Sequence, residues 1–210
     1  MTTSPRRRSY DSTGRRLAAE RRREDVLRAA ADRFRSDGWH RTTVAAIASD
    51  AGVSVDLVSL RVGTKVTLLV ESLRATAFTQ VPDLRQAVEA LDLGGPETSV
   101  EERVARFSSF AVATLEPIAE FHDVLRQAAD AEPPARAMLD EIERTRRDST
   151  QIVLRKILLA DPDPQLVDEL FVLTSTAVYC ELTQRCGWSS AQVQTWLRQV
   201  VGEAVTRSRS

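Results

Sequence analysis

The stretch from residue 44 to residue 65, VAAIASDAGVSVDLVSLRVGTK, has the residue spacing of a DNA-reading motif. A helix-turn-helix needs a small residue where its two helices touch, a glycine where the chain turns left-handed, and apolar anchors on either side. Ala48 and Gly52 meet the first two needs, and the anchors are Ile47, Ala51, Val53 and Val58. A helical corner that binds nothing has the same spacing, so the pattern alone leaves both interpretations open.

If the segment reads DNA, its second helix, about residues 54–60, enters a major groove. Helix N-termini at Thr43 and Thr64 then face phosphates. Leu57 either contacts a thymine methyl or turns into the core. Arg61 is the strongest candidate contact, because it directly follows the helix and its position is therefore fixed. The predicted DNA contacts are Thr42, Thr43, Ser54, Val55, Asp56, Leu57, Ser59, Leu60, Arg61, Thr64 and Lys65.

The charge of the chain is divided unevenly between its two parts. Up to Lys65 there are 14 basic and 8 acidic side chains, a net charge of +6, whereas the remainder holds 15 basic and 22 acidic, a net charge of −7. A basic N-terminal third joined to an acidic body indicates a module that faces a polyanion. Residues 1–16 are expected to be a disordered basic arm whose arginines either reach DNA or remain a solvated tail: Arg6, Arg7, Arg8, Arg15 and Arg16.

The elements that must position these residues are all expected to be helices, with no strand pattern and no repeat. The first runs from about Leu17 to Asp37 and stops at Gly38. Short helices capped by Thr43 and Ser54 follow, and a fourth extends to Pro82. Beyond the loop at 94–99, further helices are expected to begin at Ser99, Pro117, Pro133, Pro164 and Ser189, with a continuous helix over 164–186 and a last one over 190–206.

The segment from Val26 to Leu69 resembles the DNA-binding domain of TetR-type transcriptional regulators. The residues that carry the resemblance are VLRAAADRFRSDGW, TTVAAIASDAGVS and GTKVTLL, in the family's order and spacing. Two positions depart from the family, which usually has tyrosine where Ser59 stands and phenylalanine where Val62 stands. The resemblance implies an all-α chain, with a helix-turn-helix domain over 17–65 and a helical effector-binding and dimerisation domain over 66–210.

The resemblance also implies a homodimer formed by the last two helices, about 164–186 and 190–206. Their apolar faces are broad for one small subunit, although the same residues also suit an ordinary core: Leu170, Leu173, Ala177, Val193, Leu197, Val200 and Ala204. A small-molecule pocket is expected among the middle helices. Its candidate residues, any of which can also be core, are Phe107, Phe110, Leu115, Phe121, His122, Arg126, Met138, Phe171, Tyr179 and Gln184.

Other chemistry is poorly supported by the sequence. His122 and Asp123 are adjacent, so their side chains diverge on a helix, and neither a nucleophile elbow nor a glycine-rich phosphate loop is present. Two cysteines and two histidines make no convincing zinc site. Cys180 and Cys186 are about 9 Å apart along a continuous helix, beyond disulfide reach. We expect both to be reduced core thiols, with a redox-sensing role as the alternative, in a cytoplasmic protein with no cofactor and no membrane span.

The sequence thus favours a cytoplasmic repressor that binds a pseudo-palindromic operator as a homodimer and leaves it when a small apolar molecule binds. Two alternatives stay open. A helical dimer with degenerate DNA recognition would bind a ligand or a protein, with Leu57 and Leu60 as a protein-contact patch. A nonspecific DNA-coating protein would depend on the basic arm and would show a steep dependence on salt.

Overall fold

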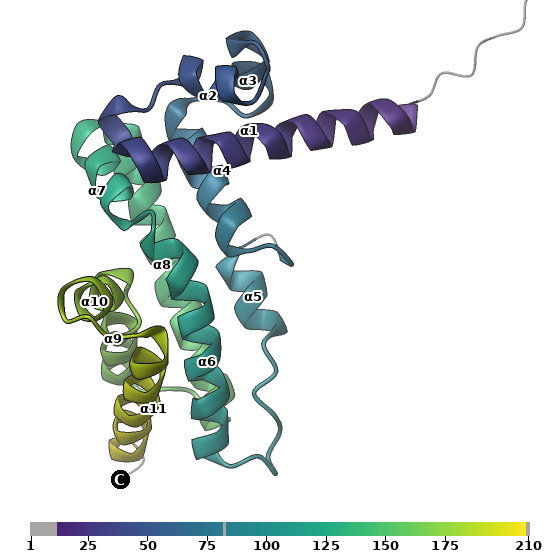
Figure 1. Ribbon diagram of the computed structural model, residues 1–210. Helices are drawn as coiled ribbons and strands as arrows, with labels where there is room; N and C mark the ends of the chain where they lie inside the picture. The colour runs from purple at the N-terminus through teal and green to yellow at the C-terminus, as the bar shows by residue number, and fades with distance from the viewer. Residues whose placement is uncertain (1–11, 82, 209–210) are drawn as a thin grey trace, which may run out of the picture.

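The computed structural model describes residues 12–81 and 83–208, and over these ranges it is all-α, without a strand. α1 (Ser12–Arg41), α2 (Val44–Asp50) and α3 (Val55–Arg61) lie at one end of the molecule, and α4 (Lys65–Ala77) leads from them into the body (Figure 1). The body contains α5 (Leu84–Ala90), α6 (Val100–Ala119), α7 (His122–Ala131) and α8 (Pro133–Leu158). α9 (Pro164–Leu173), α10 (Thr176–Cys180), a π-helical turn (Glu181–Arg185) and α11 (Ser190–Arg207) complete it.

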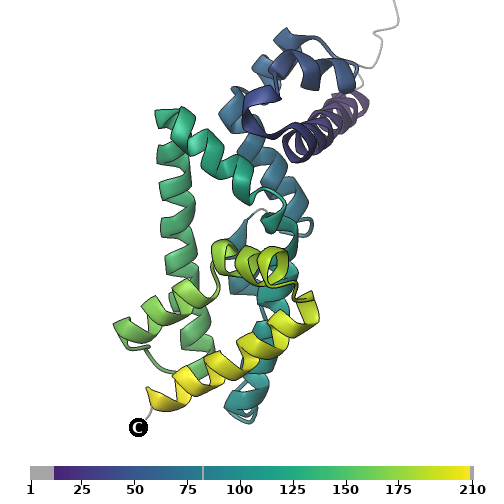
Figure 2. The same cartoon turned by 60° about the vertical axis from the view of Figure 1, so that its left-hand side comes forward.

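Two hydrophobic clusters hold this arrangement together. The N-terminal cluster joins α1–α4 to α7 and includes Phe34, Trp39, Ile47, Val58 and Phe121. The C-terminal cluster joins α6, α8, α9 and α11. α11 packs along α6 at the end of the molecule away from α2 and α3 (Figure 2). Because α7 contributes to the N-terminal cluster, the two parts of the chain share a packed boundary rather than only the α4 connection.

Side-chain caps fix most of the predicted helix starts. Thr43 accepts from the Ala46 N–H at 3.1 Å, and Ser54 accepts from the Leu57 N–H at 3.2 Å. Ser99 caps α6 in the same way. Ser189 forms the predicted reciprocal capping box with Gln192. Each cap satisfies a backbone donor that has no partner within its helix.

Several sequence predictions about helix bounds are wrong. α1 already begins at Ser12, so residues 12–16 are helical and not part of an arm, whereas Arg6, Arg7 and Arg8 lie outside the described residues. α4 ends at Ala77, well before Pro82. Pro117 lies inside α6 and starts no helix. Its missing N–H cannot donate to the carbonyl one turn earlier, that of Ala113, an exposed residue.

The helix predicted over 164–186 is broken at Thr174 and Ser175. The Thr174 hydroxyl donates to the Leu170 carbonyl at 2.8 Å, and the Ser175 hydroxyl accepts from the Val178 N–H at 3.2 Å. These local bonds compete with the helical ladder, so the chain restarts as α10. Cys180 is buried and Cys186 is exposed, both unpaired, which contradicts the prediction that both are core thiols.

Candidate functional site

The α2–α3 pair has the geometry of a helix-turn-helix. Gly52 adopts a φ of 65° in the turn, a conformation that costs glycine little. The Val53 N–H donates to the Ala48 carbonyl at 2.9 Å and closes the turn. Val58 is completely buried and anchors α3 on the N-terminal cluster. Val62, the last-turn cap of α3, also packs on this cluster, where it fills the position that the resemblance gives to an aromatic ring.

The outer face of α3 carries an unusual mixture of side chains. Leu60 is 79% exposed and Val55 is 44% exposed. Asp56, Ser59 and Arg61 are also exposed. Leu57 is half-buried and, with Arg61, borders a shallow hollow against α1 at Arg22, Arg23 and Val26. The outer face of α3 therefore combines apolar groups with one cation, Arg61, and one anion, Asp56, and Leu57 contributes to it only in part.

In the structure Thr42 and Lys65, both predicted as DNA contacts, have hydrogen-bond partners inside the chain. Thr42 is 1% exposed, and its hydroxyl donates to the Gly38 and Arg33 carbonyls. Lys65 donates to the Trp39 carbonyl, and its ammonium lies 4.1 Å from the centre of the Trp39 ring. Desolvation by burial lowers the pKa of Lys65. The sequence placed both residues correctly next to helix starts but could not reveal these partners.

The basic residues of α1 have mixed surroundings. Arg16 is exposed and pairs with Glu20 at 3.6 Å. Arg23 donates to Glu71 at 2.6 Å and so ties α1 to α4. Arg21 and Arg22 are exposed. Of the described α1 residues, Arg21 and Arg22 therefore have the most freedom to meet a phosphate.

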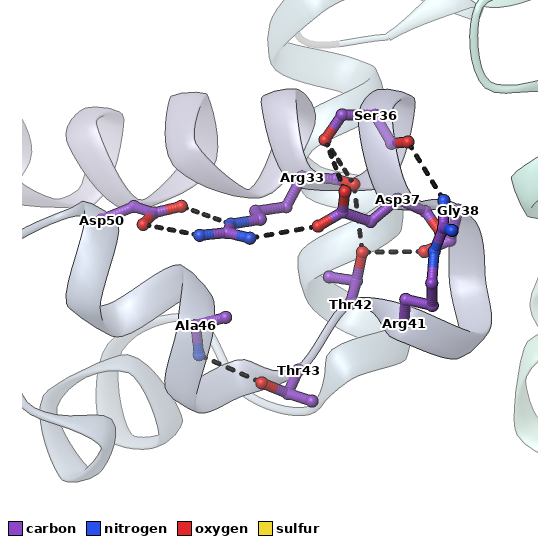
Figure 3. A network of polar contacts seen from close by, with 9 residues as sticks. All are labelled: Arg33, Ser36, Asp37, Gly38, Arg41, Thr42, Thr43, Ala46 and Asp50. Atoms are coloured by element: carbon purple, nitrogen blue, oxygen red, sulfur yellow. Dashed lines mark hydrogen bonds and ion pairs between the residues drawn. The ribbon is translucent and has the colours of Figure 1, made fainter.

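An arginine–aspartate network holds α2 against α1. Figure 3 shows the Arg33 guanidinium between Asp50 of α2 and Asp37 of α1. Its Nη2 donates to Asp50 at 2.9 Å and its Nη1 to Asp37 at 3.1 Å. Hydrogen bonds from Arg33 lower the pKa of each carboxyl below its usual value. The network thus orients α2, the first helix of the helix-turn-helix, relative to α1.

We expect this network to make the stability of the N-terminal part depend on pH. A carboxyl whose pKa is lower in the folded state stabilises the fold above its unfolded pKa of about 3.9, and that contribution disappears as pH falls through the folded pKa. Thermal melts followed by circular dichroism should therefore show a falling midpoint from about pH 5 downwards, and Asp50→Asn should flatten the decline. Asp56→Asn, at an exposed residue without a described ion-pair partner, is the control. Identical pH profiles for Asp50→Asn and the wild type would contradict the prediction.

A cavity of about 460 Å³ lies among α4, α6, α7, α8 and the start of α10. Apolar atoms provide most of its wall, and charged side chains also line it: Arg74, Asp83, Arg126, Glu141, Glu143 and Arg146. Arg74 is paired with Glu71 and Arg146 with Glu143. A cavity of this size with a mainly apolar wall suits a small organic molecule. The apolar lining includes Val70, Leu73, Phe78, Ile118, Leu125, Met138 and Ile142.

The ten predicted ligand residues fall into three groups. His122, Arg126 and Met138 line this cavity. Phe107, Phe110 and Leu115 line a smaller chamber of about 70 Å³ beside it. The other four line neither: Phe121 is fully buried below Arg35, Phe171 lies under the Arg146 guanidinium, Tyr179 bonds to Ser190, and Gln184 is exposed.

The sequence analysis missed the α4 side of the cavity and, apart from Met138, its α8 side. Val70 and Leu73 are at helical spacing on α4, which only marks them as inward-facing, and Phe78 directly follows that helix. Arg146 lies in a polar stretch of α8 that the sequence could assign either to an exposed helix or to a break; the structure keeps this helix continuous. No local signal distinguishes a cavity wall from a packed core, because the difference depends on what lies opposite.

α7 connects the cavity with the helix-turn-helix. His122, Leu125 and Arg126 line the cavity. From the same helix, Gln127 accepts the Trp39 N–H at 3.1 Å. Trp39 follows Gly38, where α1 kinks at φ 71° and ψ −172°. α7 therefore contacts both the cavity and the C-terminal end of α1.

The faces predicted for dimerisation are partly used inside the subunit. Leu170, Val193, Leu197 and Ala204 are buried in the C-terminal cluster. The exposed apolar surface left on the same helices is limited: Val172 is 57% exposed, Ala177 is exposed but lines the cavity, and the half-buried Leu173, Trp196 and Val200 pack against that cluster. The residual patch is therefore smaller than the sequence pattern indicated.

The fold is shared with solved structures of transcriptional regulators. A protein assigned to the TetR family from Mesorhizobium loti is 23% identical, with a TM-score of 0.68 over 90% of this chain and 96% of that one. A protein assigned as a transcriptional regulator from Pseudomonas aeruginosa is 20% identical, with a TM-score of 0.69 over 96% and 99%. NalD, the secondary repressor of the MexAB-OprM multidrug efflux pump in Pseudomonas aeruginosa, is 16% identical, with a TM-score of 0.64 over 89% and 97%.

No family model and no curated protein matches the sequence. The similarity to these solved structures shows that the chain has the all-α fold of TetR-type regulators, as the sequence resemblance predicted. Over the described residues, no helix is both long and apolar enough to cross a membrane.

Proposed function

We propose that this protein, which has the fold of TetR-type regulators, is a non-catalytic, sequence-specific DNA-binding transcriptional regulator that responds to a small molecule. The observation that carries the proposal is the exposed outer face of α3, held rigidly by the caps of Thr43, Ser54 and Thr64. In this proposal, the module over 17–65 reads DNA, the part over 66–210 binds the effector and dimerises, and the protein acts in the cytoplasm.

The DNA contacts in this proposal come from α3 and the helix starts around it. Arg61 provides the charge, and Val55 and Leu60 provide apolar surface for thymine methyl groups. Two copies joined by the residual patch on α9, α10 and α11 would place their two α3 helices in successive major grooves of a pseudo-palindromic operator. Effector binding in the cavity would change the distance between the two α3 helices through α4 and α7. Repression would end if the effector binds more tightly to the state whose α3 spacing does not match the operator.

Selection of bound fragments from random DNA by the purified protein at about 0.15 M salt tests the proposal. A recovered two-fold symmetric motif is expected. A folded dimer that recovers no motif would contradict sequence-specific regulation. It would favour the second candidate, a helical dimer that contacts another protein through the exposed Leu60 and the half-buried Leu57.

Arg61→Ala is expected to weaken binding to the selected DNA about 10-fold or more at 0.15 M salt, because it removes a fixed cation from the end of α3. The dependence of affinity on salt should also become shallower by about one unit per lost phosphate contact. Fluorescence anisotropy over a salt series measures both quantities. Arg155→Ala is the matched control, because Arg155 is an exposed arginine at the far end of α8. Equal losses for the two variants would show that Arg61 acts only through general charge.

A further inference from the structure

A small chamber beside the main cavity has a polar feature that the proposed function does not explain. The chamber has a volume of about 70 Å³ and shares Leu84, Ile118, Arg146 and Thr176 with the walls of the main cavity. Its remaining walls are apolar apart from a few hydroxyl groups. The hydroxyl-bearing residues are Thr114, Ser149, Thr150, Thr174 and Thr176.

Ser149 is the exceptional residue in this chamber. It is 2% exposed, and its Oγ has no hydrogen-bond partner among the described residues. Other buried hydroxyls are bonded to backbone carbonyls: Ser72 to Leu69, Ser108 to Val104, and Thr150, next to Ser149, to Arg146. A buried hydroxyl without a partner costs about 1–3 kcal/mol. Its position in a chamber wall therefore points to a partner that comes from outside the chain.

The charges around the chamber indicate what kind of partner fits. Arg146 is the charged residue among its lining, and its guanidinium already bonds to Glu143 and to the Phe171 carbonyl while lying 3.6 Å from the centre of the Phe171 ring. An ionised ligand group would enter an apolar space with no free counter-charge, which is strongly unfavourable. An uncharged oxygen can bond to Ser149 without this penalty.

We infer that the chamber binds a neutral hydroxyl or carbonyl group of the effector through Ser149, while the apolar body of the same molecule occupies the main cavity. The effector class is thus an uncharged amphipathic molecule with an oxygen at one end. Ser149 donates to a carbonyl, and it donates or accepts with a hydroxyl. This inference rests on the proposed function only in calling the ligand an effector.

Three probes of equal chain length separate the charge classes: 1-octanol, octanoate and octylammonium. Isothermal titration calorimetry of the full-length protein without DNA should show tightest binding for 1-octanol. Ser149→Ala should weaken 1-octanol binding about 3- to 10-fold, the effect of one hydrogen bond, and leave the two ions unaffected. Ser108→Ala is the matched control, because this buried serine lines neither space and bonds to its own helix.

Stability provides a second readout. Ser149→Ala should melt at or above the wild-type temperature, since it removes a hydroxyl without a partner, whereas Ser108→Ala loses a bond and should melt no higher than wild type. The inference is overturned if Ser149→Ala binds 1-octanol as the wild type does, if an ion binds more tightly, or if no probe binds saturably. Binding is measured without DNA, so a failure to recover an operator would refute regulation but leave this result intact.

Discussion

Trp39→Ala is expected to lower the free energy of unfolding by about 3–5 kcal/mol, the usual cost of emptying a large aromatic site. Trp39 is 2% exposed, and its ring stacks on Phe34 with centroids 6.0 Å apart. The ring also faces the ammonium of Lys65. Truncation removes this apolar packing and leaves a partly buried cation without its aromatic partner.

Urea unfolding followed by circular dichroism measures the loss. His40→Ala, at the exposed neighbouring position, should change stability by less than about 0.5 kcal/mol. A loss below about 1 kcal/mol for Trp39→Ala would mean that the N-terminal cluster does not depend on this ring.

Arg103→Met is expected to cost about 3–5 kcal/mol, because it removes a buried, charged donor that bonds to three carbonyls, including the buried carbonyl of Ile157. Arg103 is 4% exposed. Its guanidinium donates to the carbonyls of Ile157 at 2.7 Å, Thr98 at 2.6 Å and Gly95 at 3.0 Å. The cation thus caps the C-terminal end of α8, where the helix dipole favours positive charge, and fixes the loop before α6.

The control for Arg103 is Arg106→Met on the same helix. Arg106 is exposed and pairs with Glu102 at 2.6 Å across one helical turn, and such a pair contributes about 0.5 kcal/mol or less. Chemical unfolding of both variants gives the comparison. Similar losses for the two would show that burial of Arg103 adds nothing beyond an ordinary surface interaction.

Features that depend on a few neighbouring residues were predicted from the sequence. The caps of Thr43, Ser54 and Ser189 bond to backbone groups three residues away, so residue type and spacing suffice. The same holds for the turn at Gly52 and for the inward position of Val58. Local signals misled at Pro117, where proline is tolerated inside α6, and at Thr174, where a hydroxyl interrupts an apolar pattern.

Features that depend on distant residues were decided by the tertiary structure. Both lysines of the chain are bound to carbonyls far away in the sequence: Lys65 to Trp39, and Lys156 to Val88, Glu89 and Leu91. The sequence shows that a residue is basic but not whether its side chain binds a phosphate or a backbone carbonyl. The sequence therefore predicts Lys65 as a DNA contact without revealing the partner that it has inside the chain.

The sequence by itself determined the all-α class, the helix-turn-helix and the face of α3 that points outward, because periodicity and capping are local properties. Only the tertiary structure decided where the cavity lies, which predicted ligand residues reach it, and that Ser149 lacks a partner inside the chain. A cavity is a space that packing leaves unfilled. Its walls come from α4, α6, α7 and α8, and no single segment carries its outline.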